Sequence, residues 1–211
     1  MPATPPLITA TSLACRRGRR TLFKDVGLEL RAGGALLVGG RNGSGKTTLL
    51  RTLCGLTQPE AGRVEWRGRP IGERRDEYHA ELLYLGHANA LKDDLTAEEN
   101  LAASQGLAAA VSPDDVRRTL TDLGLAACAR LPARALSQGP RRRVALARLW
   151  LARERPLWIL DEPFVALDSE ATQTLRCLLE AHLDVGGVLV FTTHQEVTIA
   201  PDRLQRLALD S

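Results

Sequence analysis

The residues best suited to chemistry lie in the segment GRNGSGKT at 40–47, which matches the pattern G-x-x-x-x-G-K-[ST]. Its glycines let backbone N–H groups wrap a phosphate without Cβ clashes. Lys46 can reach the β- and γ-phosphate oxygens, and Thr47 can ligate Mg²⁺. The alternative is a glycine-rich turn with an incidental lysine, but a strand pattern precedes the segment and a helical pattern follows it. We therefore predict a nucleoside triphosphate site formed by Gly40, Arg41, Asn42, Gly43, Ser44, Gly45, Lys46, Thr47 and Thr48.

Two adjacent carboxylates, Asp161 and Glu162, follow the apolar run LWIL at 157–160. Successive side chains of a strand point to opposite sides, so the two carboxylates cannot share a direction. Asp161 can support Mg²⁺ through a water molecule. Glu162 can orient or deprotonate the water that attacks the terminal phosphate. An ordinary acidic strand end has the same pattern, but beside a phosphate loop the pair favours nucleotide hydrolysis.

A single histidine, His194, ends the strand-like segment VLVFTTH. Histidines at strand ends are commonly structural or merely exposed. In a parallel sheet this strand end would lie beside the ends of the strands that carry the phosphate loop and Asp161. There the imidazole can contact the γ-phosphate and hold the attacking water together with Glu162.

A second anion site is indicated by LSQGP at 136–140, where Ser137 occupies an N-cap position before the basic helix RRRVALARLWL. The N-terminus of a helix presents free N–H groups and a partial positive charge. Pro140 is compatible with the first turn of this helix, where its missing N–H would have no intrahelical partner. The segment is therefore predicted to face a phosphate.

Alternating strands and helices must position these residues. We expect strands at 7–13, 26–30, 35–40, 63–68, 82–85, 157–160 and 188–193, and helices at 47–56, 97–109, from Ser112, from Ser137 and at 169–183. Thr96 with Glu99 is a capping-box pattern, and Ser112 precedes Pro113 as an N-cap. The alternation predicts a parallel sheet covered on both faces, with 88–135 as a helical insertion.

Composition narrows the class of protein further. The 211 residues carry a net charge of +3 with 25% charged residues, which favours a solvated surface over a nucleic-acid interface. The four cysteines, Cys15, Cys54, Cys128 and Cys177, form no CxxC pair, so a zinc site is not supported and reduced thiols are expected. The sequence contains neither an apolar run of about 18 residues nor a secretory signal pattern, so we expect an intracellular chain.

The motifs GRNGSGKTT, LSQGP, LWILDEP, ALD at 166–168 and TTH at 192–194, in this order, resemble the nucleotide-binding subunit of an ABC transporter over about 7–209. The resemblance implies an ATPase that uses ATP and Mg²⁺. It implies one α/β domain over 1–211, a P-loop NTPase cassette with a mostly parallel sheet and N-terminal antiparallel strands. A small helical subdomain, roughly 88–150, would be inserted in the RecA-like core.

The same resemblance implies a head-to-tail pair of cassettes with two ATP molecules between them. Ser137 and Gly139 of one copy would face the γ-phosphate held by the other, and Asp168 would lie at the same interface. His194 would act as the switch histidine of the family. The signature departs from the usual LSGGQ at Gln138 and Pro140, which predicts weaker closure of the dimer.

A narrower resemblance, to the ATP-binding subunit of the haem exporter of cytochrome c maturation, rests on the stretches 78–101, 141–151 and 156–168. It implies an integral membrane permease as partner and a peripheral location on the cytoplasmic face of the inner membrane. His87, where most cassettes have glutamine, is expected to assist catalysis, and contacts with the permease are expected at 86–101. The alternatives are a cassette for another small-molecule exporter and a weakly hydrolysing regulatory cassette. Ribosomal or DNA-repair ABC proteins are disfavoured because the chain has one cassette and no heptad run.

The adenine subsite departs from the pattern of many cassettes, which stack the base on an aromatic ring after the first strand. Arg16 or Arg17 occupies the expected position, and Phe23 lies too far along the chain. A guanidinium can stack on a base, so loose base selectivity is expected.

Overall fold

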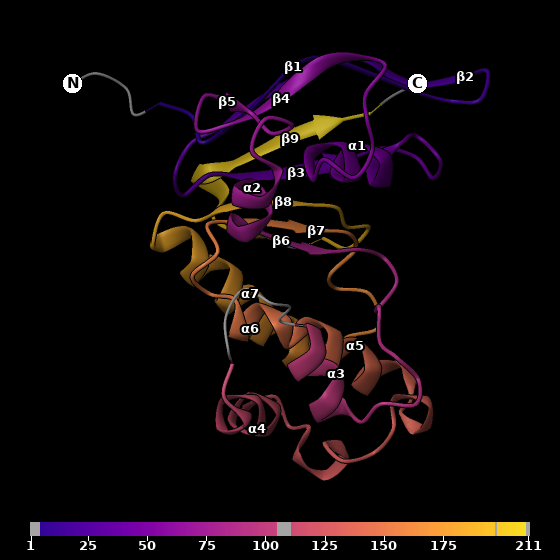
Figure 1. Ribbon diagram of the computed structural model, residues 1–211, viewed down its shortest axis with the longest axis vertical. Coiled ribbons are helices and arrows are strands. Elements are labelled where there is room, and N and C mark those ends of the chain that lie inside the picture. The colour runs from indigo at the N-terminus through magenta and orange to yellow at the C-terminus, as the bar shows by residue number, and fades with distance from the viewer. Residues whose placement is uncertain (1–4, 105–110, 197, 210–211) are drawn as a thin grey trace. The chain divides into compact units, whose positions relative to one another are not determined.

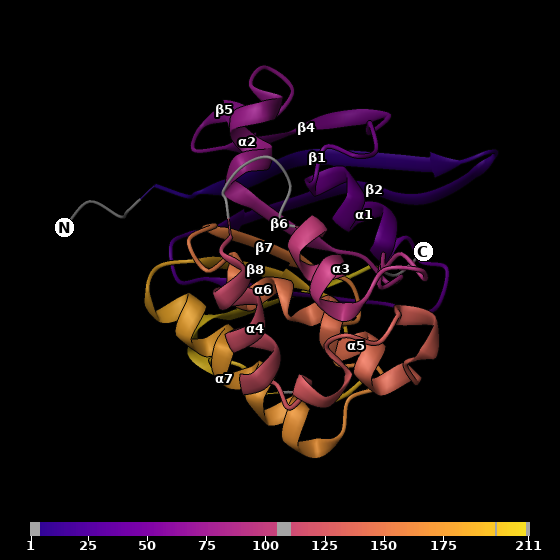
Figure 2. The same ribbon diagram turned by 60° about the horizontal axis from the view of Figure 1, so that its bottom comes forward.

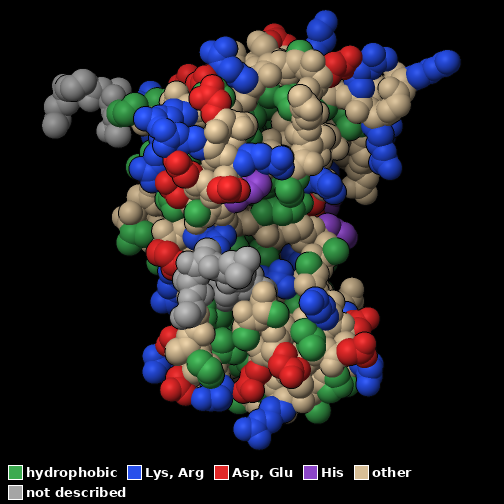
Figure 3. Space-filling model, viewed as in Figure 1, with side chains coloured by type: hydrophobic (Ala, Val, Ile, Leu, Met, Phe, Trp, Pro, Cys, Tyr) green, Lys and Arg blue, Asp and Glu red, His purple; other side chains and the backbone are tan. Residues whose placement is uncertain are grey.

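The computed structural model describes residues 5–104, 111–196 and 198–209, and the chain divides into two compact units. The first unit is drawn from residues 1–84, 155–162 and 179–211, and the second from 85–154 and 163–178. No helix in the described ranges is long and apolar enough to cross a membrane. On the face drawn in Figure 3, acidic and basic side chains are interspersed, as the small net charge leads one to expect.

A five-stranded sheet forms the centre of the first unit, with the order β6-β7-β8-β3-β9. Its strands are β3 (Ala35–Gly39), β6 (Leu82–Leu85), β7 (Leu157–Leu160), β8 (Val188–Phe191) and β9 (Leu204–Ala208). The β3–β8, β3–β9 and β7–β8 pairs are parallel (Figure 1). Every residue of β7 and β8 is buried, which explains their continuous apolar sequences. Strand β9 was not predicted.

The N-terminal strands form a second, antiparallel sheet with the order β2-β1-β4-β5. Its strands are β1 (Ile8–Arg17), β2 (Arg20–Leu30), β4 (Ala61–Trp66) and β5 (Arg69–Pro70). The predicted limits 7–13 and 26–30 were wrong, because the arginine-rich segment between them is a hairpin and not a loop. Arg17 pairs with Arg20, and Gly18 supplies the positive φ of 64° that the turn requires.

Helix α1 (Lys46–Leu53) lies between the two sheets of this unit, as Figures 1 and 2 both show. Leu49, Leu50 and Leu53 are fully buried and share one apolar cluster with both sheets. Helix α2 (Arg75–Glu81), which was not predicted, packs nearby, and the Tyr78 hydroxyl donates to the Leu53 carbonyl at 2.6 Å. The core therefore fixes α1 and, with it, the loop that begins the helix.

The second unit is helical, with α3 (Ala97–Ser104), α4 (Pro113–Asp122), α5 (Gln138–Leu146), α6 (Arg148–Leu151) and the part of α7 (Ser169–Asp184) up to residue 178. The capping box is confirmed, since the Thr96 hydroxyl accepts from the Glu99 amide and the Glu99 carboxylate accepts from the Thr96 amide. Ser112 caps α4 as predicted. Residues 105–109 of the predicted helix 97–109 lie outside the described residues.

Candidate nucleotide site

The phosphate-loop segment connects β3 to α1 and can be folded only with glycine at specific places. Gly40, Gly43 and Gly45 have φ values of 134°, 80° and 103°. A Cβ on Gly40 would lie 2.6 Å from Ser44 Oγ and 2.7 Å from the Leu209 carbonyl oxygen. These close approaches leave no room for a side chain, so the backbone itself forms the wall of the loop.

Two side chains of the loop and the first N–H groups of α1 are suited to binding an anion. Lys46 Nζ donates to the carbonyl oxygens of Gly40 at 2.8 Å and Arg41 at 3.3 Å, so the ammonium lies over the loop. Ser44 is 3% exposed, and its hydroxyl has no hydrogen-bond partner among the described residues. Gly45, the N-cap of α1, supplies no side-chain cap to the first N–H groups of the helix. A phosphate group would satisfy all three kinds of donor.

A hydroxyl and a carboxylate meet beside the loop. Thr47 Oγ1 donates to Asp161 Oδ2 at 2.8 Å, although the two residues lie 114 positions apart in the sequence. Both are hard oxygen ligands, the type that Mg²⁺ prefers. Within the described residues no group of three or more His, Cys, Asp or Glu side chains could hold a metal. The two oxygens of Thr47 and Asp161 fit Mg²⁺, which is commonly held by one or two protein oxygens together with substrate phosphates.

Glu162 and His194 form the second pair of the site. His194 Nε2 lies 3.3 Å from Glu162 Oε1. The glutamate side chain is 9% exposed and the histidine side chain 57%, so only the histidine lies largely in solvent. The two residues follow β7 and β8, which are neighbours in the sheet. The strand order thus brings together the two side chains that the sequence suggested for water activation.

Two further residues contribute to this part of the first unit. Thr192 is fully buried, and its hydroxyl bonds both acidic residues. Sequence reasoning missed it, and its closeness to His194 in the sequence is a signal that it shares with Thr193. Burial raises the pKa of Tyr84 to about 12, and the negative charge of Asp161 adds to this effect. Tyr84 therefore remains a neutral phenol near Asp161.

The other predicted site residues belong to the second unit. Ser137 is the N-cap of α5, is exposed, and makes no side-chain capping bond; Gly139 is the second residue of the helix. Asp168 Oδ1 accepts from the Ala171 amide at 2.8 Å at the start of α7. His87 is exposed in the segment that follows β6. The structure thus brings the phosphate loop, Asp161, Glu162 and His194 together in the first unit. The other four predicted residues, Ser137, Gly139, Asp168 and His87, are described only within the second unit.

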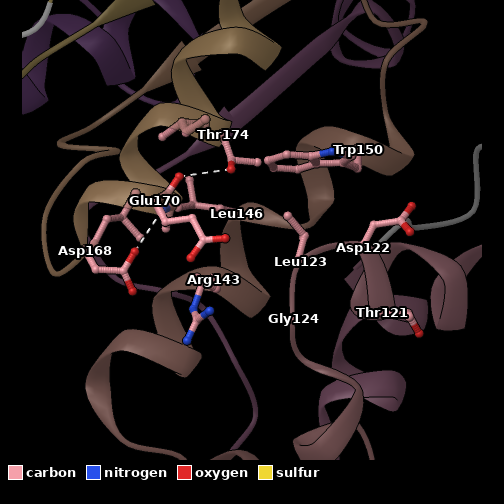
Figure 4. Close-up of a pocket in the computed structure, with 13 residues that line it drawn as sticks. Thr121, Asp122, Leu123, Gly124, Arg143, Leu146, Trp150, Asp168, Glu170 and Thr174 are labelled. Atoms are coloured by element: carbon pink, nitrogen blue, oxygen red, sulfur yellow. Dashed lines mark hydrogen bonds between the residues drawn. The ribbon is translucent and has the colours of Figure 1, made fainter.

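Asp168 also lines a pocket of about 290 Å³ within the second unit (Figure 4). The end of α4, the α5 and α6 helices and the first turns of α7 contribute its wall. Trp150 and Leu123 form an apolar side, and Arg143, Asp122 and Glu170 add charge. The pocket therefore offers a mixed surface next to Asp168.

A phosphate loop at the end of an interior parallel strand, with Thr–Asp and Glu–His pairs beside it, defines a P-loop nucleoside triphosphatase. The sequence model described as ABC transporter matches residues 23–165. The chain belongs to the ABC transporter family, as the motifs predicted, and is an ATP-binding ATPase of that family.

Relatives described as cytochrome c biogenesis ATP-binding export protein CcmA match over nearly the whole chain. The protein of Aromatoleum aromaticum is 49% identical over 205 residues, covering 95% of this chain and 94% of the relative. That of Dechloromonas aromatica is 48% identical, covering 96% and 100%. That of Shigella flexneri is 43% identical, covering 96% of each. The narrower resemblance predicted from the sequence is therefore confirmed.

Solved structures confirm the predicted α/β cassette fold. One described as the ATP binding subunit of an ABC transporter has a TM-score of 0.77 and 26% identity, covering 89% of this chain and 80% of that chain. A putative ABC transporter ATP-binding protein from Pyrococcus furiosus has a TM-score of 0.79, covering 95% and 96%. Its identity is 23%, so this second likeness bears on the fold alone.

Proposed function

We propose that this chain energises an export step in the biogenesis of c-type cytochromes, with haem as the exported or delivered group. The relatives, which are described as cytochrome c biogenesis export proteins, support this process. The 3.3 Å pairing of Glu162 with His194 beside the phosphate loop carries the hydrolytic part of the proposal. It supplies a base and a second polar group where the terminal phosphate would lie.

Hydrolysis begins with ATP on the phosphate loop. Lys46 exchanges the Gly40 carbonyl for the β- and γ-phosphate oxygens, and the backbone N–H groups of the loop bind the β-phosphate. Glu162 accepts a hydrogen bond from water and takes its proton as the water oxygen attacks the γ-phosphorus. His194 holds the water and the γ-phosphate from the solvent side. ADP leaves with the β-phosphate oxygen that was bonded to the γ-phosphorus.

Thr47 and Asp161 would hold Mg²⁺, which neutralises charge on the phosphate oxygens when it is bound. The Thr47 hydroxyl, which donates to Asp161 Oδ2, would turn its oxygen toward the ion. Asp161 would then act from beyond the directly bound oxygens, through water. Its buried position directly after β7 keeps the carboxylate in a fixed place.

A second copy of the cassette would complete the site. The Ser137 hydroxyl does not cap its own helix, so it is available to a γ-phosphate held by the partner copy, as is the Gly139 N–H. Asp168 would contact the partner copy beside them. A separate integral membrane permease would bind around His87 and residues 86–101, which places the cassette peripherally on the cytoplasmic face of the inner membrane. No role with nucleic acid is proposed.

The proposal is tested by placing Glu162→Gln, as the only copy, in the host and staining its cytochromes for covalently attached haem. Glu154→Gln, an exposed residue before β7, is the matched control. We expect haem-stained cytochromes to disappear in Glu162→Gln at normal protein levels and to persist in the control. Normal staining in Glu162→Gln would remove the cytochrome assignment and favour another cargo. Equal, near-zero ATPase rates of the purified wild type and Glu162→Gln would favour a regulatory cassette.

A further inference from the structure

Thr192, the residue that follows β8, is bonded to the end of β7 at three successive positions. Its backbone N–H donates to the Leu160 carbonyl at 3.1 Å. Its hydroxyl donates to Asp161 Oδ1 at 2.8 Å. The same hydroxyl oxygen accepts from the Glu162 backbone N–H at 2.9 Å. Thr192 is 0% exposed, so water cannot replace these bonds.

The directions of these bonds are determined by chemistry. An ionised carboxylate only accepts and a backbone amide only donates, so the single proton of the hydroxyl must point at Asp161. Asp161 consequently receives one hydroxyl on each oxygen, Thr192 on Oδ1 and Thr47 on Oδ2. If Thr47 turned to a bound metal ion, the Thr192 hydroxyl would still hold Oδ1 of the carboxylate. The oxygen Oδ2 then faces the phosphate loop.

The bond to the Glu162 amide acts on the second carboxylate. Glu162 has φ of 53°, a left-handed conformation that costs a residue with a side chain free energy. This conformation turns the chain directly after β7 and sets the direction of the glutamate side chain toward His194. A buried amide without a partner would favour a different backbone conformation. Thr192 therefore holds Glu162 in the conformation that pairs it with His194.

We propose that Thr192 is a positioning residue for both halves of the reaction, orienting Asp161 toward the metal and Glu162 toward the attacking water. The inference rests on the proposed hydrolytic roles of Asp161 and Glu162. Thr192 itself touches neither nucleotide nor metal. Its effect passes through one hydroxyl, which donates to the Asp161 carboxylate and accepts from the backbone N–H of Glu162.

Three variants of the full-length chain test the role. Thr192→Val keeps the shape and removes the hydroxyl, whereas Thr192→Ser keeps the hydroxyl and removes a methyl group. Thr193→Val removes the neighbouring hydroxyl, which accepts from the Gln195 amide at 3.0 Å, and is the matched control. Each is measured for Mn²⁺ binding with ATP by electron paramagnetic resonance, for metal-free ATP binding by fluorescence, and for kcat and KM.

We expect Thr192→Val to weaken Mn²⁺ binding and lower kcat by about tenfold each, as loss of a bond to a metal-supporting carboxylate commonly does. Metal-free ATP binding should change by less than about twofold, because the phosphate loop is untouched. Thr192→Ser should stay within about threefold of the wild type and Thr193→Val within about twofold. If Thr192→Val does not fold, Thr192→Ala takes its place with the same expectation.

Wild-type Mn²⁺ binding and kcat in Thr192→Val would overturn the inference. So would an equal loss in Thr192→Ser, which would assign the effect to the methyl group, or in Thr193→Val, which would assign it to the whole segment. Failure of the proposed function would be seen separately. If the wild type does not hydrolyse ATP, the proposed function is wrong. The comparison of Mn²⁺ binding between the wild type and Thr192→Val still tests the effect of Thr192 on Asp161.

Discussion

The imidazole of His182 stacks face to face on the indole of Trp158, with ring centroids 3.9 Å apart and planes inclined by 6°. His182 Nε2 lies 3.3 Å from the Val188 carbonyl oxygen, so the proton belongs on Nε2. Nδ1 is buried and has no hydrogen-bond partner among the described residues. Burial lowers the pKa of His182 to about 4, although the Val188 carbonyl opposes this shift. The histidine is therefore neutral in the folded protein at neutral pH.

Stability should fall in acid because of this histidine. Its pKa is 6.5 in an unfolded chain and about 4 in the fold, so the unfolded chain binds more protons between these values. The contribution is fully present above pH 6.5 and is lost as the pH falls toward 4, by about 3 kcal/mol in total. Urea unfolding of the wild type and His182→Phe at pH 7.5 and about pH 5 measures it. Parallel losses of unfolding free energy in both proteins would contradict the prediction.

Gly187→Ala should destabilise the same region. A Cβ at Gly187 would lie 2.2 Å from Cε1 of His182, inside van der Waals contact, and the ring cannot retreat because Trp158 is stacked on its face. We expect a loss of about 2–3 kcal/mol of unfolding free energy, in the range of overpacked cores. Gly72→Ala, which has no atom within 4 Å of its added Cβ, is the control. Similar melting temperatures for both variants would show that the two rings can move apart.

His194→Ala should remove activity without affecting the fold. The side chain is 57% exposed, so its loss should change the unfolding free energy by less than about 0.5 kcal/mol. Its contact with Glu162 predicts a fall in ATPase kcat of about 100-fold, within the range for a group that assists proton transfer. Calorimetry and steady-state kinetics on one preparation separate the two effects. Glu196→Ala, another exposed residue, should leave both unchanged, and a wild-type kcat in His194→Ala would remove the histidine from the reaction.

Pro140→Gln should strengthen ATP-driven pairing of two cassettes. Helix α5 begins at Gln138, so Pro140 is its third residue, where an N–H has no partner within the helix. Glutamine restores that donor and adds a side-chain amide. We expect the dimer to form at about tenfold lower protein concentration, equivalent to roughly one hydrogen bond to a charged phosphate. Sedimentation in a Glu162→Gln background with ATP measures it, and unchanged dimerisation with unchanged ATPase activity would show that Pro140 is neutral.

Much of the site could be predicted because its chemistry is local in sequence. The phosphate loop and the LWILDEP strand end, like the capping box of Thr96 and Glu99, are contiguous patterns whose neighbours along the chain determine their conformation. Thr192 was missed for the opposite reason. Its importance comes from contacts with Asp161 and Glu162, which lie about thirty residues earlier, and no local pattern distinguishes it from the adjacent Thr193.

Strands were predicted least well where charged side chains interrupt the alternation of apolar and polar residues along the sequence. The hairpin of β1 and β2 contains arginines on its exposed positions, which obscure the buried residues Cys15 and Leu22, so the predicted strands stopped at 13 and began again at 26. Strand β9, with Gln205 and Arg206 at its centre, pairs with β3 through its backbone and shows little apolar alternation. Edge strands need only one buried face, so a short edge strand shows only a weak hydrophobic pattern in the sequence.

The position of β3 between β8 and β9 has a consequence for synthesis of the protein. Its two neighbours are β8 and β9, so Leu37 pairs with Phe191 on one side and with Arg206 on the other. A ribosome must therefore have translated more than 190 residues before the strand that carries the phosphate loop acquires either neighbour. Until then the apolar segment ALLVG is exposed on both edges, and a nascent chain in this state is a substrate for chaperones. ATP binding competence should thus appear late and abruptly during translation.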